Sequence, residues 1–336
     1  MGNKIGKRTL EFNNGIYIQS YGNVVGKFEG EGPLSKCFDM IINDEYFGEK
    51  TYEKAETKLQ KTALSSALQK GLLNISQLDL IASGDLLNQC ISSSYSVRDN
   101  DIPFVGLFGA CSTMALSTII ASMSVECGYS NLAAGVTSSH FCSAERQFRQ
   151  PLEYGGQRPP SSQRTVTAGA AVIVGNNKTK AKISKITFGS VIDFLITDAN
   201  NMGAAMAPAA VDTMSNFFRD TNTNPSDYDL ILTGDLGYVG SSLFKDMIKE
   251  KGYSMGREYN DCGNMIFDAN KQDTHSGGSG CGCSGAVLTG FVLPKISSGE
   301  LKNVLFMSTG ALMSPTSSMQ GDSIPSVAHL INIVGE

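Results

Sequence analysis

Apolar residues along this chain follow two spacings, one typical of helices and one typical of strands. In residues 51–68, Ala55, Leu59 and Ala63 recur near helical spacing among polar residues, which predicts an amphipathic helix at the surface. Short apolar runs that end at glycine or polar residues predict strands. These strands cover residues 78–86, 102–108, 131–139 and 167–175 in the first half and 181–191, 228–236 and 302–311 in the second, where residues 244–251 continue a helix.

Two longer segments carry no charge. Residues 111–125 and residues 281–293 contain no Asp, Glu, Lys or Arg. Ser112 or Thr113 can cap the start of the first segment. A helix that is apolar nearly all round must be buried on all sides, so we expect the two helices to pack together between two sheets.

The two halves of the chain resemble each other. Six of eight positions are identical between residues 79–86 and residues 229–236, and a Cys-Ser pair opens at Cys111 and again at Cys283. This pattern predicts a duplicated α/β fold. We expect halves at residues 1–177 and 178–336, stacked in five layers as helix, sheet, helix, sheet, helix. The alternative is two separate doubly wound domains, each covering its own uncharged helix.

Composition narrows the classes of protein that the chain can belong to. Of 336 residues, 41% are hydrophobic and 18% are charged, which predicts a globular protein with a large core. The net charge of −5 argues against a nucleic-acid binder. We find no apolar run long enough to cross a membrane and no signal peptide, so we expect synthesis in the cytosol. The eight cysteines include no C-x-x-C pair, and the motif GGSGCGC lacks the lysine of a phosphate-binding loop, so neither a structural zinc site nor a P-loop is expected.

The sharpest local feature is a cysteine at the start of an uncharged helix. In FGACST (108–113) a strand ends, small residues turn the chain, and Cys111 follows. A helix N-terminus favours the thiolate and lowers the pKa of a cysteine there, so Cys111 is a candidate nucleophile. The alternative is an inert buried cysteine beside a tight turn.

Several motifs together resemble one family. They are GDLLNQ (84–89), FGACST (108–113), SSHFCSAERQFR (138–149), EYGGQ (153–157), MAPAA (206–210), DLILTGDL (229–236), GGSGC (277–281) and TGALMSPT (309–316). They resemble the stage V sporulation protein AD family of spore-forming bacteria, within the thiolase and ketoacyl synthase superfamily. The resemblance implies a thiolase-like fold that binds dipicolinic acid, as the free acid or its calcium chelate, for transport into the developing spore. It also implies a peripheral position at the inner spore membrane, beside membrane proteins of the same operon, and a place in sporulation and germination.

The residues of condensing chemistry are only partly matched. Cys111 matches the nucleophile, but Asp235 stands near where a condensing enzyme carries histidine, and Ser279 or Cys281 stands where a ketoacyl synthase carries asparagine. A thiolate without a base and an oxyanion donor is a poor acyl-transfer catalyst. We therefore expect a binding protein without catalytic residues or cofactor. The alternatives are an acyl-CoA thiolase or 3-oxoacyl synthase that uses Cys111, and a structural adaptor with a vestigial pocket.

The implied dicarboxylate ligand predicts a pocket between the halves, at the carboxyl ends of the strands. Planar Arg side chains recognise carboxylates best. Residues 145–164 contain four arginines, Arg146, Arg149, Arg158 and Arg164. Of these, Arg146 is the predicted ligand residue. This stretch is otherwise a solvated loop or a subunit contact of an expected homodimer. Asp85 either accepts a hydrogen bond from the ligand, binds its calcium, or caps a turn. We expect no metal bound by the protein itself. The predicted ligand-binding residues are Asp85, Asn88, Cys111, Ser112, His140, Arg146 and Gly280.

Overall fold

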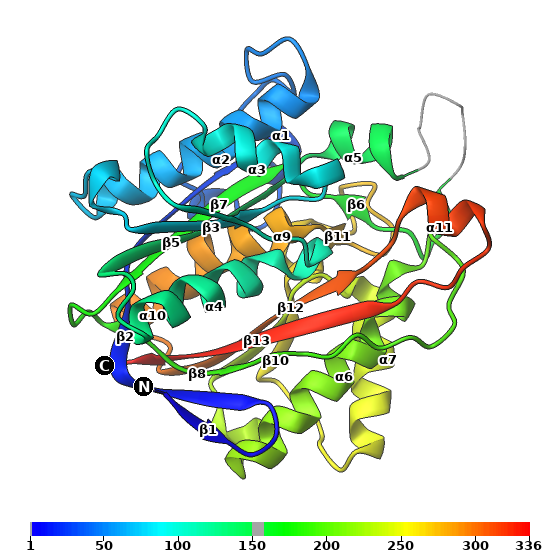
Figure 1. Cartoon of the computed structure of the whole chain (residues 1–336). Helices are drawn as coiled ribbons and strands as arrows, with labels where there is room; N and C mark the ends of the chain where they lie inside the picture. Colours follow the sequence, from blue (N-terminus) through cyan, green and yellow to red (C-terminus); the bar gives the residue numbers. More distant parts are fainter. Residues whose placement is uncertain (1, 150–157) are drawn as a thin grey trace.

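The computed structural model describes residues 2–149 and 158–336, which form a mixed α/β fold with helices on both sides of the sheet (Figure 1). The elements of the first half are β1 (Asn3–Ile5), β2 (Thr9–Val25), α1 (Lys27–Gly30), α2 (Tyr52–Lys70), β3 (Leu80–Gly84), α3 (Ile91–Val97), β4 (Phe104–Gly106), α4 (Thr113–Glu126), β5 (Leu132–Ser139), α5 (Phe141–Gln147), β6 (Arg164–Thr165) and β7 (Ala168–Gly175). Those of the second half are β8 (Ala181–Thr187), α6 (Met202–Thr221), β9 (Leu230–Thr233), α7 (Gly237–Glu250), β10 (Tyr259–Asp261), α8 (Cys262–Ile266), β11 (Gly278–Ser279), α9 (Cys281–Val287), α10 (Leu293–Ser298), β12 (Asn303–Ala311), α11 (Pro315–Met319) and β13 (Ser326–Gly335).

The order of the strands is symmetric about the middle of the sheet. It runs β10-β9-β12-β13-β8-β2-β7-β5-β3-β4, with β1 paired to β2. Strands at equal distances from the centre of this order occupy equivalent positions in the two halves. For example, β3 is parallel to β5 in the first half, as β9 is parallel to β12 in the second. This is the arrangement that a duplicated fold predicts. The boundary after residue 177 falls between β7 and β8 and stays a prediction.

The long strand β2 connects the two sheet layers that enclose the central helices. Its first part, from Thr9 to Tyr17, pairs with β8, and its second part, from Tyr17 to Val25, pairs with β7. Hydrogen bonding is therefore continuous through the centre, and the strands on the two sides of the central helices belong to one eleven-stranded sheet. The hydrophobic pattern did not predict this connection, because β2 carries no clear strand signal of its own.

The two uncharged segments form the middle layer, as expected. Helix α4 packs against β5 and β3 on one side and β12 on the other, and it contacts α9 (Figure 1). Helix α4 begins only at Thr113, because a 3₁₀ turn holds Ala110–Ser112. The second segment is one stack of α9, a π-helical turn at Leu288–Val292 and α10.

The outer layers cover the remaining faces of the sheet. Helix α2 lies over β2 and β7, with α3 beside it, while α6 lies over β13 and β12, with α7 beside it (Figure 1). In α2, Ala55, Leu59 and Ala63 are fully buried, which confirms the predicted amphipathic face. Among the described residues, no helix combines the length and apolar character that crossing a membrane requires.

Candidate functional site

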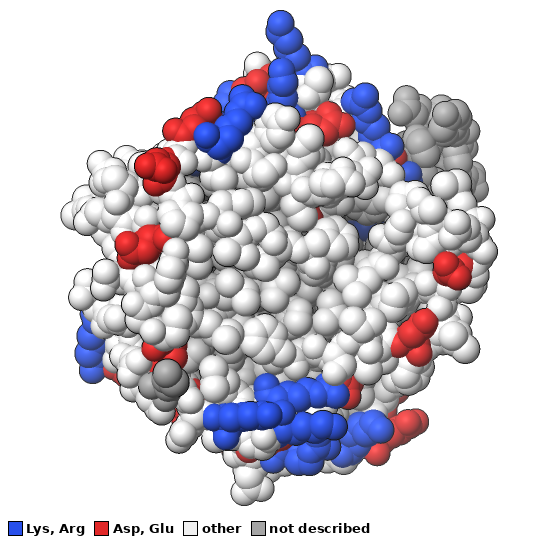
Figure 2. All heavy atoms as spheres, in the orientation of Figure 1, with Lys and Arg blue, Asp and Glu red and all other residues white. Residues whose placement is uncertain are grey.

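A cavity of about 250 Å³ opens where several strands end. Its walls come from the segments after β3, β4 and β12, from the end of α5 and from the start of α6, so it lies at the carboxyl ends of the strands, as expected. Figure 2 shows a hollow on this face, between the segments labelled α3, α5 and α11 in Figure 1, with a basic side chain at its floor. The lining residues are Leu86, Leu87, Asn88, Gln89, Cys90, Phe108, Ala110, Cys111, Phe148, Arg149, Met202, Ala311, Met313, Ser314 and Pro315.

Asp85 shapes one wall of the cavity from behind. Its Oδ1 accepts a hydrogen bond from the Leu87 amide (2.8 Å), and its Oδ2 accepts hydrogen bonds from the Ser93 amide (2.7 Å) and hydroxyl (2.6 Å). Between Leu87 and Ser93, the residues Gln89 and Cys90 have left-handed backbone conformations, with φ of 55° and 49°. Residues other than glycine rarely adopt these conformations unless the surrounding structure enforces them. Asp85 is therefore a cap of this turn, fully buried and outside the cavity lining.

Cys111 lies in the cavity wall beside the second half of the chain. Its Sγ is 3.9 Å from the Ser279 hydroxyl. The Asp235 carboxylate accepts hydrogen bonds from Ser279 Oγ (3.1 Å) and from the Gly280 amide (2.8 Å) with its Oδ2. Its Oδ1 accepts one from Thr309 Oγ1 (2.8 Å). The structure thus brings together the three positions that the sequence analysis compared with condensing enzymes.

The electrostatics of this cluster suppress the thiolate. Burial raises the pKa of Cys111 well above its usual value, and the Asp235 carboxylate raises it further. The expectation that this pKa is lowered is wrong, because burial and the adjacent carboxylate both raise it. Since the thiolate is the reactive form of a cysteine, these surroundings disfavour a nucleophilic reaction at Cys111.

Arg149 supplies the positive charge in the cavity. Its Nη1 donates to the Gln163 carbonyl oxygen and its Nη2 lies 3.8 Å from Met202 Sδ. Its Nε is buried and has no hydrogen-bond partner among the described residues. Burial lowers the pKa of Arg149, with Cys111, Glu145 and Asp235 acting in the opposite direction, and a guanidinium stays protonated even so. Among the described residues of the lining, Arg149 is the one charged side chain.

Two of the seven predicted ligand residues, Asn88 and Cys111, line the cavity, and Asp85, Ser112, His140, Arg146 and Gly280 do not. Ser112 is fully buried and donates to the Gly109 carbonyl oxygen (2.6 Å). Gly280 has a φ of 113° and donates its amide to Asp235. The Arg146 side chain is 62% exposed and pairs with Glu53 at 3.7 Å.

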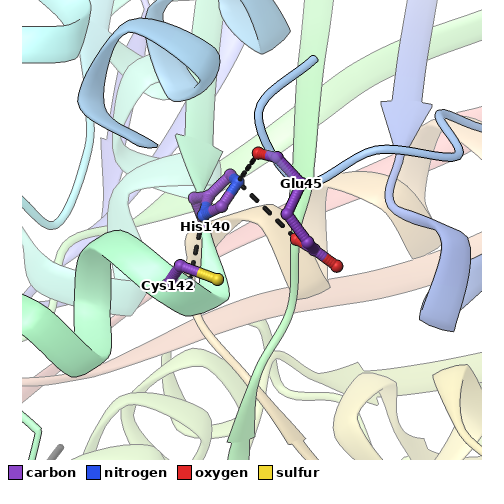
Figure 3. Close-up of side chains that lie close together, drawn as sticks. All are labelled: Glu45, His140 and Cys142. Atoms are coloured by element: carbon purple, nitrogen blue, oxygen red, sulfur yellow. Dashed lines mark hydrogen bonds and ion pairs between the residues drawn. The ribbon is translucent and has the colours of Figure 1, made fainter. Parts of the chain in front are cut away.

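His140 locks a loop onto α5 (Figure 3). Its Nδ1 accepts a hydrogen bond from the Cys142 amide (3.1 Å), so the ring proton is on Nε2, which donates to the Glu45 carbonyl oxygen (2.8 Å). Burial lowers the pKa of His140 to about 4, and the ring is neutral. Ligand atoms of these three residues lie within 4.8 Å of one another. Glutamate, histidine and cysteine are all residue types that bind zinc, but the protonated Nε2 of His140 has no lone pair for a metal. The two hydrogen bonds of the His140 ring instead hold the loop at Glu45 against the start of α5.

Arg149 lines the cavity, whereas Arg146, the arginine predicted as the ligand residue, does not. Helix α5 ends at Gln147, so Arg149 follows the turn inward while Arg146 stays on the helix surface. Its place within the arginine-rich stretch was the available signal. Met202 and Met313 reach the cavity from the second half without any local signal. The motif EYGGQ (153–157) lies outside the described residues.

Several solved structures share this fold at low sequence identity. The 3-oxoacyl-[acyl-carrier-protein] synthase III of Aquifex aeolicus is 12% identical, with a TM-score of 0.58 over 95% of this chain and 100% of that chain. The Acat5 thiolase of Ascaris suum, in complex with coenzyme A, is 11% identical, with a TM-score of 0.60 over 96% of this chain and 100% of that chain. OleA of Xanthomonas campestris, with cerulenin bound, is 12% identical, with a TM-score of 0.57 over 96% of this chain and 97% of that chain. These likenesses confirm the predicted thiolase-like fold.

The similarity in sequence is much closer to a sporulation protein. The stage V sporulation protein AD of Bacillus subtilis (strain 168) is 43% identical over 324 residues, which cover 96% of this chain and 96% of that protein. A family model described as Stage V sporulation protein AD matches residues 6–334. The chain therefore belongs to the stage V sporulation protein AD family.

Proposed function

We propose that this chain binds dipicolinic acid (pyridine-2,6-dicarboxylate) in the cavity beside Cys111, without converting it, for its transport into the developing spore. The observation that carries the proposal is Arg149. A guanidinium at the cavity wall, with an N–H that no described residue accepts, is a recognition group for a carboxylate.

The size and walls of the cavity suit a small aromatic acid. Its volume of about 250 Å³ is near the lower end of the range of about 300–1,000 Å³ for small-molecule sites. The side chains of Phe108, Phe148 and Met202 provide apolar surface for a ring, and Asn88 and Ser314 provide polar groups at the same cavity. An aromatic ring between apolar walls, with a carboxylate at Arg149, uses both kinds of surface.

The absence of turnover rests on Cys111. Acyl transfer requires a thiolate, and burial together with Asp235 disfavours it. None of the three histidines is among the described residues that line the cavity. The rival function, an acyltransferase that uses Cys111, is supported by the fold and by the position of the cysteine. Incubation with acyl-CoA and intact-mass measurement decide between them, since a stable acyl adduct on Cys111 would reject the binding-only proposal.

Calorimetric titration with dipicolinate, with and without calcium, tests the ligand. We expect saturable binding that Arg149→Leu weakens by about 10-fold or more, the loss of one charge-assisted contact. Arg146→Leu is the matched control, because Arg146 lies three residues away on the exposed surface, and it should leave binding unchanged. No saturation at millimolar dipicolinate, under either condition, rejects the proposal.

We propose a second copy of this chain as one partner. Strand β4 is the last strand in the sheet order, and Val105 on it and Tyr95 on α3 are exposed apolar residues. Figure 2 shows a face whose charged side chains lie mostly at its rim. Sedimentation velocity should give a dimer that Val105→Asp dissociates and Leu72→Asp, at a more exposed leucine, does not. A monomer at all concentrations contradicts this proposal.

For its place in the cell, we propose peripheral attachment to the inner membrane of the forespore, beside membrane proteins of the same sporulation operon. The support is membership of the family. Fractionation of forespores tests it: the protein should sediment with membranes when the rest of the operon is present and stay in the supernatant when those genes are deleted. Equal distribution in both strains contradicts attachment through these partners.

A further inference from the structure

One buried glutamine lies where three parts of the site meet. Gln163 is 2% exposed and directly precedes β6, which pairs with β11 of the second half. The main chain on either side of Gln163 is also bonded to the second half. The Ser162 carbonyl oxygen accepts a hydrogen bond from the Ser276 amide (2.8 Å), and the Arg164 amide donates one to the Gly277 carbonyl oxygen (2.9 Å). Gln163 is therefore part of a first-half segment held against a loop of the second half.

The side chain of Gln163 binds two carbonyl groups of the second half. Its Nε2 donates to the Asp235 carbonyl oxygen (2.7 Å) and to the Gly278 carbonyl oxygen (2.8 Å). Asp235 and Gly278 are both buried. The Asp235 side chain bonds Ser279, the residue after Gly278, and the Ser279 hydroxyl is 3.9 Å from Cys111 Sγ. An amide with two N–H groups satisfies both at once, which an apolar side chain of equal length cannot do.

The main chain of Gln163 holds Arg149. Its carbonyl oxygen accepts the hydrogen bond from Arg149 Nη1, and the other contact of that guanidinium is the thioether of Met202. A thioether is a weak acceptor. The Gln163 carbonyl is therefore the stronger of the two hydrogen-bond acceptors given for this guanidinium, which also feels the charges of Glu145 and Asp235.

We propose that Gln163 is a positioning residue, which fixes Arg149 and the Asp235 segment relative to each other. The side-chain amide of Gln163 holds this residue against the second half. The main-chain carbonyl oxygen of the same residue is thereby fixed, and it binds the guanidinium of Arg149. The importance of this for ligand binding rests on the proposed function, because Arg149 is the residue proposed to receive the carboxylate. The geometry at Cys111 does not depend on any ligand.

The alkylation rate of Cys111 measures the position of Arg149 without a ligand. The positive charge of Arg149 lowers the pKa of the thiol, and below that pKa the rate follows the fraction of thiolate. In Gln163→Met, which keeps the length of the side chain but not its donors, the guanidinium should withdraw. We expect iodoacetamide to react with Cys111 more slowly, by about 10-fold for each unit that the pKa rises, as followed by peptide mass mapping. A variant that only loosens the fold exposes Cys111 and reacts faster.

Three further variants complete the test. Arg149→Leu should slow alkylation as well, and adding Gln163→Met to it should cause no further slowing, since both act through the same charge. Asn332→Met is the control: its buried amide also donates to two acceptors, Asn303 Oδ1 and the Val304 carbonyl oxygen, at the start of β12, and its rate should equal that of the unmodified chain. An unchanged or faster rate in Gln163→Met, or additive effects in the double variant, overturns the inference.

Dipicolinate titration then separates this inference from the proposed function. If the unmodified chain binds, Gln163→Met should weaken binding by about 10-fold, and unchanged affinity overturns the role in ligand binding. If the unmodified chain does not bind, the proposed function fails, and the alkylation rates still decide whether Gln163 positions Arg149.

Discussion

Replacement of Glu56 by glutamine should remove a large part of the pH dependence of stability. Glu56 is fully buried on α2, where it accepts hydrogen bonds from Ser138 Oγ (3.1 Å) and Ser143 Oγ (2.6 Å). Burial raises the pKa of Glu56 to about 8 from its ordinary 4.5, and the nearby Asp85 carboxylate contributes in the same direction. The folded protein therefore holds a proton that the unfolded chain releases, and the free energy of unfolding falls as pH rises from 4.5 to 8.

The best window for the measurement is pH 6.5 to 8. Burial lowers the pKa of His140 and of His329 from 6.5 to about 4, so their effect on stability, which has the opposite sign, ends at pH 6.5. Within the window Glu56 accounts for a loss of about 2 kcal/mol, at 1.36 kcal/mol per pH unit. Glu29 and Asp261, whose pKa values burial raises to about 7, contribute equally to variant and parent and cancel in the difference.

Urea unfolding of both proteins at pH 6.5 and pH 8 is the assay. Glutamine keeps the shape of the side chain and can bond to the same two serines, so Glu56→Gln should lose about 2 kcal/mol less than the parent between the two pH values. Glu250→Gln, at an exposed position on α7, is the control and should follow the parent. Equal losses in parent and Glu56→Gln, or a parent that is more stable at pH 8, would refute the reasoning.

Three further predictions concern the cavity. Gly84→Ala should cost about 1–3 kcal/mol in urea unfolding, because the new Cβ would lie 2.0 Å from the Leu107 carbonyl oxygen; a neutral substitution contradicts this. Asp85→Ala should also cost about 1–3 kcal/mol, because the amides of Leu87 and Ser93 lose their acceptor, and unchanged stability would show that the cap is dispensable. Cys111→Phe should fill the cavity and abolish dipicolinate binding while circular dichroism shows an intact fold, and normal binding would mean that the ligand lies elsewhere.

The fold was predictable where one local pattern dominates. Charge-free segments identified the central helices, and helical spacing identified α2 within two residues at each end. The patterns predict no element at β2, whose seventeen residues include Asn13, Asn14 and Gly15, because its strand conformation comes from its two neighbours. They also predict none at α6, which contains Pro208 within the helix. Tertiary contacts override weak local preference in both.

The position of the cavity was predictable, but most of its lining was not. The end of a strand and the start of a helix at Cys111 marked the position of the cavity, and the resemblance between the halves pointed to Asp235, which bonds Ser279 beside Cys111. The choice between Arg146 and Arg149 depended on where α5 ends. The nearest helix breaker in the sequence, Pro151, stands four residues after the last helical residue, so it does not fix on which side of the helix end Arg149 lies. Asp85 and His140 have chemistry suited to a ligand, but both turn inward to satisfy backbone groups, a use that the residue type alone does not distinguish.

The single strand that serves both sides of the sheet has a consequence for how the protein comes apart. Strand β2 pairs with β7 of the first half along one part and with β8 of the second half along the other. If either half unfolds, part of β2 therefore loses its hydrogen-bonded neighbour, and the half that remains folded has an incomplete sheet. Heating should therefore give one calorimetric transition, and a chain cut between the copies should stay together until both are denatured. The cavity is lined by residues of both halves, so we expect it to be lost as soon as either half unfolds.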